Sequence, residues 1–292
     1  MTDHLLDHVR PYLARTPKER IYYILSPLWI GYGAALAAHR TLDGLLSRPP
    51  SFRTKGLMLV GPFANGKTMI AERFALQHLK TARKQRVWVV QTHEGVGLFH
   101  FYTSIIRALH APSTGGRSLN ALDGQLHQLF SELSPRVLIF DDFNNALRGR
   151  LRDTKSVFAY LRRLGREYDI SPVLVGDVTV YDYVNDSEDM GSRFELCAVP
   201  RWQYDEEYLA LLDSLEAVIP LAKASNLSDE LIARQIYSDS EALIGEIVGI
   251  VGRAAIRAIN DGSEKITLST LRALEYVPLS GRRNAPERQA LL

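Results

Sequence analysis

The chain has 292 residues, of which 46% are hydrophobic, and its formal net charge at pH 7 is +2. Such a chain can bury a sizeable core, either as one large domain or as a large and a small one. No apolar run approaches the roughly 18 residues that span a bilayer, which argues against a membrane protein. Residues 1–10 are too acidic and interrupted for a signal peptide, and the single cysteine, Cys197, excludes an internal disulfide. We therefore expect a cytoplasmic protein.

Strand and helix patterns alternate through the first two thirds of the chain. Residues 1–50 are predicted to be a helical segment leading into the core, with a helix over 30–46. Segments rich in apolar, β-branched or aromatic residues at 57–60, 86–91, 136–140, 172–176 and 195–199 are predicted to be strands. Helical spacing occupies 69–79, 99–109, 119–133 and 155–168. This alternation predicts an α/β fold with a five-stranded parallel sheet and helices on both faces.

The strand patterns stop at Asp205. Residues 229–237, 241–260 and 268–275 have helical spacing, with Ser228, Ser240 and Thr267 as expected N-caps and Gly262 closing the middle helix. We thus expect an α/β core over 51–204, a small helical lid over 205–279 and a mobile tail over 280–292.

A glycine-rich motif follows the first strand. The run Gly61-Pro-Phe-Ala-Asn-Gly-Lys-Thr68 has the form G-x-x-x-x-G-K-[ST]. A turn of this kind between a strand and a helix directs several backbone N–H groups, and the positive end of the helix, at one spot that suits phosphates. Lys67 is expected to reach the β- and γ-phosphates of ATP, and the Thr68 hydroxyl to bind Mg²⁺. An ordinary glycine turn is the alternative, and the amphipathic helix that follows disfavours it. The residues expected to contact the nucleotide are Gly61, Pro62, Phe63, Ala64, Asn65, Gly66, Lys67, Thr68 and Met69.

Two acids follow the third strand. Asp141 and Asp142 come directly after the apolar run Val137–Phe140. A carboxylate at the carboxyl end of a strand beside the phosphate loop is in place to hold Mg²⁺, and we assign this role to Asp141. Asp142 is in place to polarise the attacking water. A pair of turn aspartates that merely ends a strand is the alternative.

Several segments together resemble the AAA+ ATPase family, and within it the transposon-encoded regulators of the TniB/TnsC type. The similarity spans roughly residues 17–277. The segments that carry it are Trp29-Ile-Gly-Tyr32, Val60–Thr68, Val175-Gly-Asp177, Arg193-Phe-Glu-Leu-Cys-Ala-Val-Pro-Arg-Trp202 and Leu243-Ile-Gly-Glu-Ile247. The stretch from Arg193 to Trp202 is more specific to this group than the phosphate loop, which many NTPases share.

The resemblance implies roles for four further residues. Arg193 takes the place of an arginine finger, which is presented to ATP bound on the neighbouring subunit. The alternative for Arg193 is an ion pair with Glu188 or Glu195. Asp177 takes the place of the polar sensor near the γ-phosphate. Trp29 and Tyr32 lie in the segment that closes over the adenine, or alternatively form a buried aromatic pair.

Two positions depart from the family pattern. The second acid is Asp142, whereas the family usually has glutamate, so we expect slow hydrolysis because aspartate is one methylene shorter. In the lid, Val248 stands where AAA+ proteins often place a sensor arginine, and Arg253 follows further along the helix. A contact between a lid arginine and the nucleotide is therefore left open.

Basic residues cluster after the two acids. Arg148, Arg150, Arg152 and Lys155 are predicted to lie in a loop that enters a helix, and Arg162, Arg163 and Arg166 continue the series. Arginines without intervening acids are typical of a surface that follows a phosphate backbone, although an ordinary solvated surface is the alternative. Arg117, in the loop over 111–118, is a further candidate. Because no aromatic residue is placed to stack on bases, we expect sequence-independent contact with double-stranded DNA.

The resemblance thus implies a Mg²⁺-dependent ATPase that forms homo-oligomers on double-stranded DNA, as a ring or a helical filament. Such a protein marks a target site, works with a target-selection protein, and recruits and stimulates a transposase. One alternative is a signalling ATPase switch of the STAND type, whose lid motif is similar to Ile219-Pro-Leu-Ala222. The other is an AAA+ factor that loads a helicase or clamp.

Overall fold

The computed structural model describes residues 3–51, 53–81, 85–95, 97–112 and 118–284. The chain divides into two units, which we call the sheet unit (residues 33–200) and the helical unit (residues 1–32 and 201–292). This division differs from the expected boundary at residue 50. Helix α2 (Gly33–Ser47) contacts the sheet, whereas α1 (Pro17–Leu25) contacts a helix of the C-terminal region.

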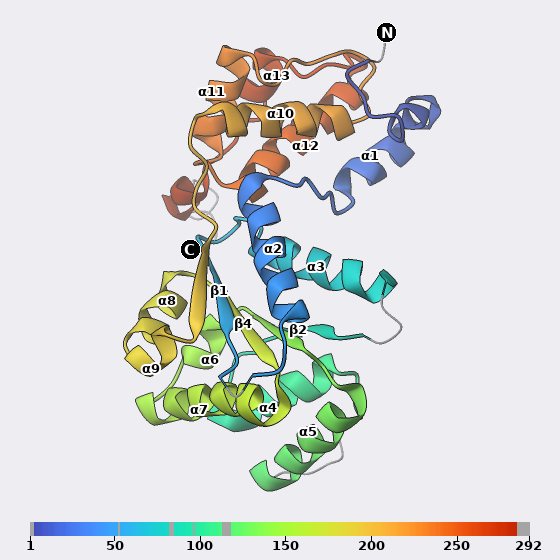
Figure 1. Ribbon diagram of the computed structural model, residues 1–292. Helices are drawn as coiled ribbons and strands as arrows, with labels where there is room; N and C mark the ends of the chain where they lie inside the picture. Colours follow the sequence, from blue (N-terminus) through green and yellow to red (C-terminus); the bar gives the residue numbers. More distant parts are fainter. Residues whose placement is uncertain (1–2, 52, 82–84, 96, 113–117, 285–292) are drawn as a thin grey trace. The chain divides into compact units, whose positions relative to one another are not determined.

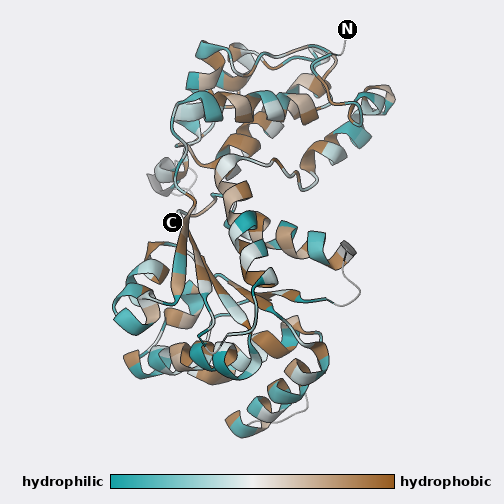
Figure 2. Cartoon of the chain, viewed as in Figure 1, coloured by the Kyte–Doolittle hydropathy of each residue, from teal (hydrophilic) through white to brown (hydrophobic). Residues whose placement is uncertain are grey.

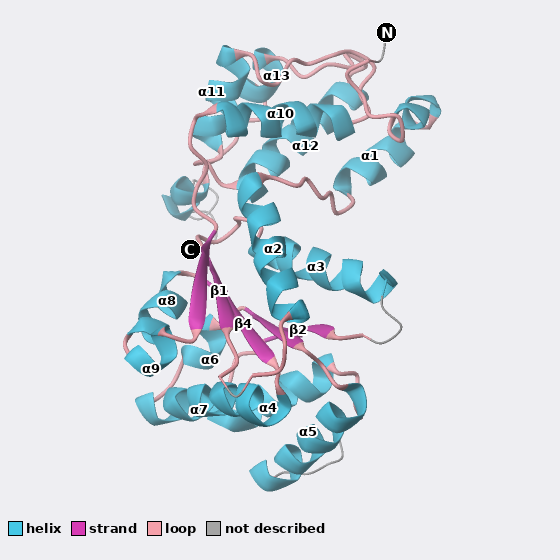
Figure 3. Ribbon diagram, in the orientation of Figure 1, coloured by secondary structure: helices cyan, strands magenta, loops and turns pink. Residues whose placement is uncertain are grey.

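The centre of the sheet unit is a parallel sheet with strand order β2-β3-β4-β1-β5 (Figure 3). This finding confirms the predicted fold class. The expected strands agree with the structure to within one residue at either end. The strands are β1 (Gly56–Val60), β2 (Val87–Gln91), β3 (Val137–Asp141), β4 (Ser171–Gly176) and β5 (Phe194–Ala198).

The register of the sheet brings the ends of its strands together. Val60 pairs with Gly176 on one side and Ala198 on the other, and Gln91 pairs with Asp141. Because all the strands are parallel, their carboxyl ends lie at the same edge of the sheet. In open sheets of this kind, ligands bind outside that edge.

Helices cover both faces of the sheet (Figure 1). Helices α4 and α7 pack against the face that carries Met58, Val90 and Phe140. Helices α2 and α3 contact each other and the sheet, and cover the other face, since side chains alternate along a strand. Figure 2 shows the apolar strands between the helices. The further helices of this unit are α3 (Lys67–Thr81), α4 (Gly97–Ala108), α5 (Leu119–Leu133), α6 (Asn144–Leu147), α7 (Leu151–Tyr168), α8 (Val178–Asn185) and α9 (Glu188–Gly191).

The helical unit has its own apolar core, which includes Tyr208, Leu212, Ile247 and Val251. Helix α10 was not among the predicted helices. The structure confirms Thr267 as an N-cap but neither Ser228 nor Ser240. Asp229 stands at the N-cap of α11, and α12 begins only after Glu241 and Ala242, whose φ values of 51° and 58° are left-handed. The elements are η1 (Arg10–Ala14), α1, α10 (Glu206–Val218), α11 (Glu230–Asp239), α12 (Ile244–Asn260), α13 (Leu268–Arg272) and η2 (Leu279–Asn284).

A buried arginine attaches the N-terminal helix to the rest of the helical unit. Arg20 is 6% exposed, donates through Nε to the Pro220 carbonyl at 3.1 Å, and forms an ion pair with Glu264. This contact engages Pro220, which lies in the segment similar to the switch-type lid motif. None of the helices within the described ranges is long and apolar enough to cross a membrane.

The start of the expected C-terminal tail is folded. Residues 279–284 form η2, in which the Ser280 N–H donates to Glu241 Oε1 at 2.9 Å and Arg282 forms an ion pair with Glu246. The remainder of that tail, 285–292, lies outside the described residues.

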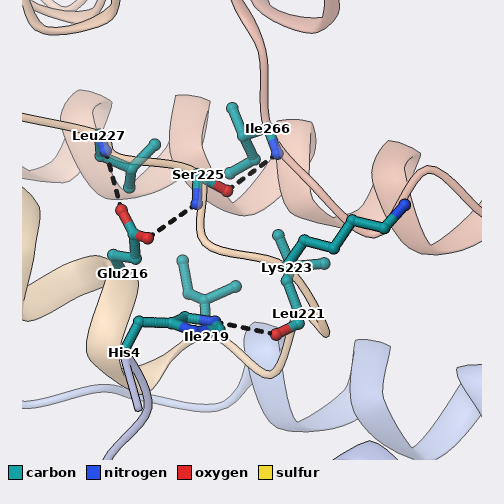
Figure 4. Close-up of a pocket in the computed structure, with 8 residues that line it drawn as sticks. All are labelled: His4, Glu216, Ile219, Leu221, Lys223, Ser225, Leu227 and Ile266. Atoms are coloured by element: carbon teal, nitrogen blue, oxygen red, sulfur yellow. Dashed lines mark hydrogen bonds between the residues drawn. The ribbon is translucent and has the colours of Figure 1, made fainter. Parts of the chain in front are cut away.

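A small pocket in the helical unit shows how this unit satisfies its polar groups (Figure 4). The two carboxylate oxygens of Glu216 accept the N–H groups of Ser225 and Leu227, both at 2.8 Å. The Ser225 hydroxyl accepts the Ile266 N–H at 2.9 Å. These contacts fix a loop and give each Glu216 oxygen a backbone donor.

Candidate active site

The phosphate loop connects β1 to α3 with a backbone path that glycine permits. Gly66 has a φ of 81°, in the left-handed region that favours glycine, and Ala64 has a φ of 56°. A Cβ atom at Gly61 would lie 2.1 Å from the Val199 carbonyl oxygen, so no larger residue fits. The Gly61 N–H donates to the Gly176 carbonyl at 3.1 Å. The loop is therefore held between the ends of β4 and β5.

Asn65 fastens the same loop from within. Its side chain is 1% exposed, and its Nδ2 donates to the carbonyl oxygens of Val199 at 2.8 Å and Pro200 at 2.7 Å. A buried amide that makes two hydrogen bonds fixes the position of the backbone that carries it. The Asn65 side chain thus stabilises the loop, whose backbone N–H groups are the ones expected to face phosphates.

Lys67 is the first residue of α3 and lies at the loop. Its Nζ donates to the carbonyl oxygens of Gly61 at 2.9 Å and Pro62 at 2.7 Å. Burial lowers the pKa of Lys67, and the carboxylates of Asp141, Asp177 and Asp142 oppose that shift. The structure therefore brings together an ammonium group and three acids from the ends of β3 and β4. These are four of the residues that the sequence singled out.

Asp141 ends β3 and is only 2% exposed. Its Oδ1 accepts the Asp142 N–H at 3.0 Å, whereas its buried Oδ2 has no hydrogen-bond partner among the described residues. Burial raises the pKa of Asp141, while the Thr68 hydroxyl and the Asp142 N–H lower it to a smaller extent. A buried carboxylate oxygen without a donor is costly unless a cation binds it. This oxygen and the Thr68 hydroxyl are the hard oxygen ligands that Mg²⁺ prefers.

Asp142 is exposed at the edge of the sheet and has a φ of 49°. Its Oδ2 accepts a hydrogen bond of 2.6 Å from Nε2 of Gln91, the last residue of β2. Sequence reasoning missed Gln91, although its position at the end of a strand was a usable signal. The amide holds one oxygen of Asp142 and leaves the other for a water molecule.

Asp177 caps the N-terminus of α8 just after β4. Its carboxylate accepts from the Thr179 N–H at 2.8 Å and from Asn144 Nδ2, while Asn144 Oδ1 accepts the Asp177 N–H at 3.1 Å. Burial raises the pKa of Asp177, but Thr179, Asn144 and Lys67 together hold it below its usual range. Asp177 is thereby held in its charged form by Thr179 and Asn144, with Lys67 contributing. Sequence reasoning also missed Asn144, which follows the two acids.

Arg193 precedes β5 and is paired within its own chain. Its Nη2 lies 3.1 Å from Asp189 Oδ1, rather than from either glutamate considered from the sequence. The other predicted residues lie elsewhere. Trp29 and Tyr32 belong to the helical unit, where the Tyr32 ring lies 5.0 Å from the ring of Trp202.

The basic cluster is smaller than the sequence indicates. Arg148 is paired with Glu94 at 2.9 Å, and Arg162, Arg163 and Arg166 all have acidic partners. Within the described part of the chain, the cations of this series that are exposed and without an ion pair are Arg150, Arg152 and Lys155. Arg152 and Lys155 lie in α7 itself rather than in a loop before it. Arg117 lies outside the described residues.

The fold and this site define a P-loop protein of the AAA+ ATPase class. The chain matches the family described as "Bacterial TniB protein" over residues 20–204, and it belongs to that family. Both findings confirm the resemblance seen in the sequence. No curated protein matches the chain.

Solved structures with a similar fold are distant in sequence. Cdc6p from Pyrobaculum aerophilum has a TM-score of 0.64 and 20% identity, with 87% of this chain and 70% of that chain covered. The ORC2 protein of Aeropyrum pernix, solved as ADPNP–ADP complexes, has a TM-score of 0.61 and 17% identity over 82% of this chain and 65% of its own. Drosophila ORC bound to DNA has a TM-score of 0.60 and 14% identity, with 89% of this chain and 65% of that chain covered. The chain thus spans about two thirds of the length of these structures, which show the fold alone.

Proposed function

We propose that this chain is a DNA-associated ATPase that regulates DNA transposition. It assembles on duplex DNA when ATP is bound, marks a target site, and recruits and stimulates a transposase. The observation that carries the ATPase part is the buried, unpartnered oxygen of Asp141 beside Lys67 and Thr68. The transposition part rests on membership of the TniB family.

The residues divide the work at the site. Loop N–H groups and Lys67 bind the phosphates, and Thr68 and Asp141 would hold Mg²⁺, which neutralises charge on the phosphate oxygens. Asp142 orients the attacking water and is itself oriented by Gln91. Asp177 lies where it can respond to the γ-phosphate through Lys67 and Asn144. Arg193 completes the site of a neighbouring copy.

Hydrolysis is proposed to be slow because Asp142 is short. We expect a kcat below roughly 1 s⁻¹ for the protein with DNA, since typical enzymes turn over at about 10 s⁻¹. Asp142→Glu should raise kcat by about tenfold, if the longer side chain holds water better. Phosphate release under saturating ATP measures both. A wild-type kcat above roughly 10 s⁻¹ would contradict the proposed slow step.

The start of α7 is the proposed DNA contact. Arg150 is the N-cap of this 18-residue helix, and Arg152 and Lys155 lie in its first turns, so their charges add to the positive helix end. We expect duplex binding to weaken steeply between roughly 50 and 200 mM salt. Changing Arg150 and Arg152 to glutamine should reduce the slope of log K against log salt by about two. Arg166→Gln, which removes a paired arginine of the same helix, is the matched control.

Assembly tests the whole proposal. Electron microscopy of the protein with duplex DNA, Mg²⁺ and a non-hydrolysable ATP analogue should show rings or helical filaments. The variant Arg193→Ala should still bind nucleotide but lose assembly or turnover. A protein that stays monomeric with all three present would overturn the assembly model.

The family match favours transposition over the switch-type and loader-type alternatives, which the fold alone does not exclude. DNA-stimulated filaments that bind a transposase would support a role in transposition. A stable complex with a replicative helicase would support a loader.

A further inference from the structure

One carboxylate outside the nucleotide site connects two arginines. Asp189 Oδ1 accepts from Arg193 Nη2 at 3.1 Å and from Arg193 Nε at 3.3 Å, while its Oδ2 accepts from Arg162 Nη1 at 3.0 Å. Asp189 lies in α9, Arg162 in α7, and Arg193 just before β5. The carboxylate therefore joins three elements of the sheet unit and holds one edge of the Arg193 guanidinium group.

The turn that presents Asp189 is itself fixed. Lys55 Nζ donates to the Ser192 carbonyl at 2.8 Å, and Arg53 Nη2 donates to the Ser192 hydroxyl at 2.6 Å. That hydroxyl donates in turn to the Asp189 carbonyl at 3.1 Å, and the neighbouring Met190 is buried. Contacts from the segment before β1 thus restrict the backbone around the carboxylate.

The geometry leaves part of Arg193 free. A guanidinium group has five N–H donors, and Asp189 uses the edge formed by Nε and Nη2. Nη1 makes no hydrogen bond to any described residue. The Arg193 hydrogen bonds hold the pKa of Asp189 below its usual range, and Arg162 adds to this effect. Burial opposes the shift to a smaller extent. The carboxylate therefore stays charged throughout the neutral pH range.

We propose that Asp189 is a positioning residue that holds Arg193 so that its free Nη1 edge reaches the triphosphate bound by a second copy of the chain. This inference rests on the proposed role of Arg193 between subunits. Fixing one edge of a long side chain reduces the conformational entropy that is lost when the other edge binds. Asp189 should therefore affect turnover on the neighbouring copy and leave nucleotide binding in its own pocket unchanged.

ATP turnover of the full chain with DNA tests this proposal. Asp189→Ala should lower kcat by about 10- to 100-fold, the usual effect of misplacing a catalytic group, without changing the affinity for a fluorescent ATP analogue. Asp189→Glu keeps a carboxylate four residues before Arg193 and should restore most of the activity. Glu230→Ala is the matched control, because it removes a similar surface pair, Glu230 with Arg234 at 2.9 Å, and should leave kcat unchanged.

Mixed assemblies separate positioning from general damage to the fold. Lys67→Ala protomers have a strongly weakened ATP site but carry an intact Asp189 and Arg193, so they should restore turnover to Asp189→Ala protomers. Arg193→Ala protomers should not restore it. Wild-type turnover of Asp189→Ala while Arg193→Ala is inactive would overturn the positioning role alone. Full turnover of Arg193→Ala would instead overturn the role of Arg193.

Discussion

The two units treat the carboxylates that they bury, wholly or in part, in opposite ways. In the helical unit, both oxygens of Glu216 accept backbone N–H groups, and Glu264 is paired with Arg20. In the sheet unit, Asp141 is more deeply buried than either glutamate, yet it keeps one oxygen without a donor among the described residues, beside Lys67 and Thr68. A buried acid whose oxygens are satisfied stabilises the fold. One that is unsatisfied, at the edge where ligands bind, indicates a site.

The largest expected effect is the loss of ATP binding at the site in the sheet unit. Lys67→Ala removes the ammonium group that lies among three carboxylates, and should weaken ATP binding by about 100-fold or more, the usual cost of losing a buried charged partner. Titration calorimetry with ATP and Mg²⁺ measures the loss. Arg73→Ala, on the same helix, is the control. If Lys67→Ala bound ATP as tightly as the wild type, Lys67 would not be a phosphate-binding residue.

The next effect concerns the paired acid of the helical unit. Arg20→Met leaves the half-buried Glu264 and the Pro220 carbonyl without their shared donor and should cost about 2–3 kcal/mol of unfolding free energy. Arg20 is the main cause that lowers the pKa of Glu264, so this stabilisation is present above the usual pKa of glutamate and is lost as the pH falls below it.

Denaturant unfolding at pH 7 and at pH 3 measures this difference. The gap between wild type and Arg20→Met should shrink in acid. Lys18→Met, an exposed cation of the same helix, should change neither value. A gap that grows in acid would contradict the assignment.

The smallest expected effects come from replacing Glu216 and Asp141, one carboxylate from each unit, by the corresponding amides. Glu216→Gln should destabilise the helical unit by about 2 kcal/mol, because the charge that accepts two N–H groups is lost. Asp141→Asn should instead stabilise the sheet unit by about 1 kcal/mol at pH 7.5, or a rise in Tm of roughly 2–4 °C. The raised pKa of Asp141 means that its charged form is a cost at that pH, which the amide removes.

Thermal unfolding of the protein without nucleotide measures both shifts. A lower Tm for Glu216→Gln and a higher Tm for Asp141→Asn would support the contrast between the two units. A lower Tm for Asp141→Asn would contradict it. The same variant should lose Mg²⁺-dependent ATP binding, so stability and ligand binding should change in opposite directions.

The sheet and the pocket could be predicted because they follow from short-range patterns. Most strands are rich in apolar residues, and the acids at the carboxyl ends of β3 and β4 share an edge once the strands are parallel. The helical unit was harder. Helix α10 begins with two glutamates directly after a polar stretch, so its apolar spacing was missed.

Long-range contacts explain the remaining differences. The helix expected over 30–46 begins only at Gly33, because Ile30 and Tyr32 pack in the core of the helical unit. Asp123 and Asp189, which neutralise Arg163 and Arg162, lie far away in the sequence. Gln91 and Asn144 carry no motif; the strand end marks Gln91 as a candidate, but its contact with Asp142 and that of Asn144 with Asp177 depend on the assembled edge of the sheet.

The contacts of Asn65 have a mechanical consequence. The two carbonyl groups that its amide binds belong to the last two residues of the sheet unit, and the chain passes into the helical unit at the next peptide bond. A triphosphate that displaces the loop by a fraction of an ångström would pull on that junction directly. Occupancy of the pocket would thus reach, through the Asn65 amide, the two residues at which the sheet unit ends.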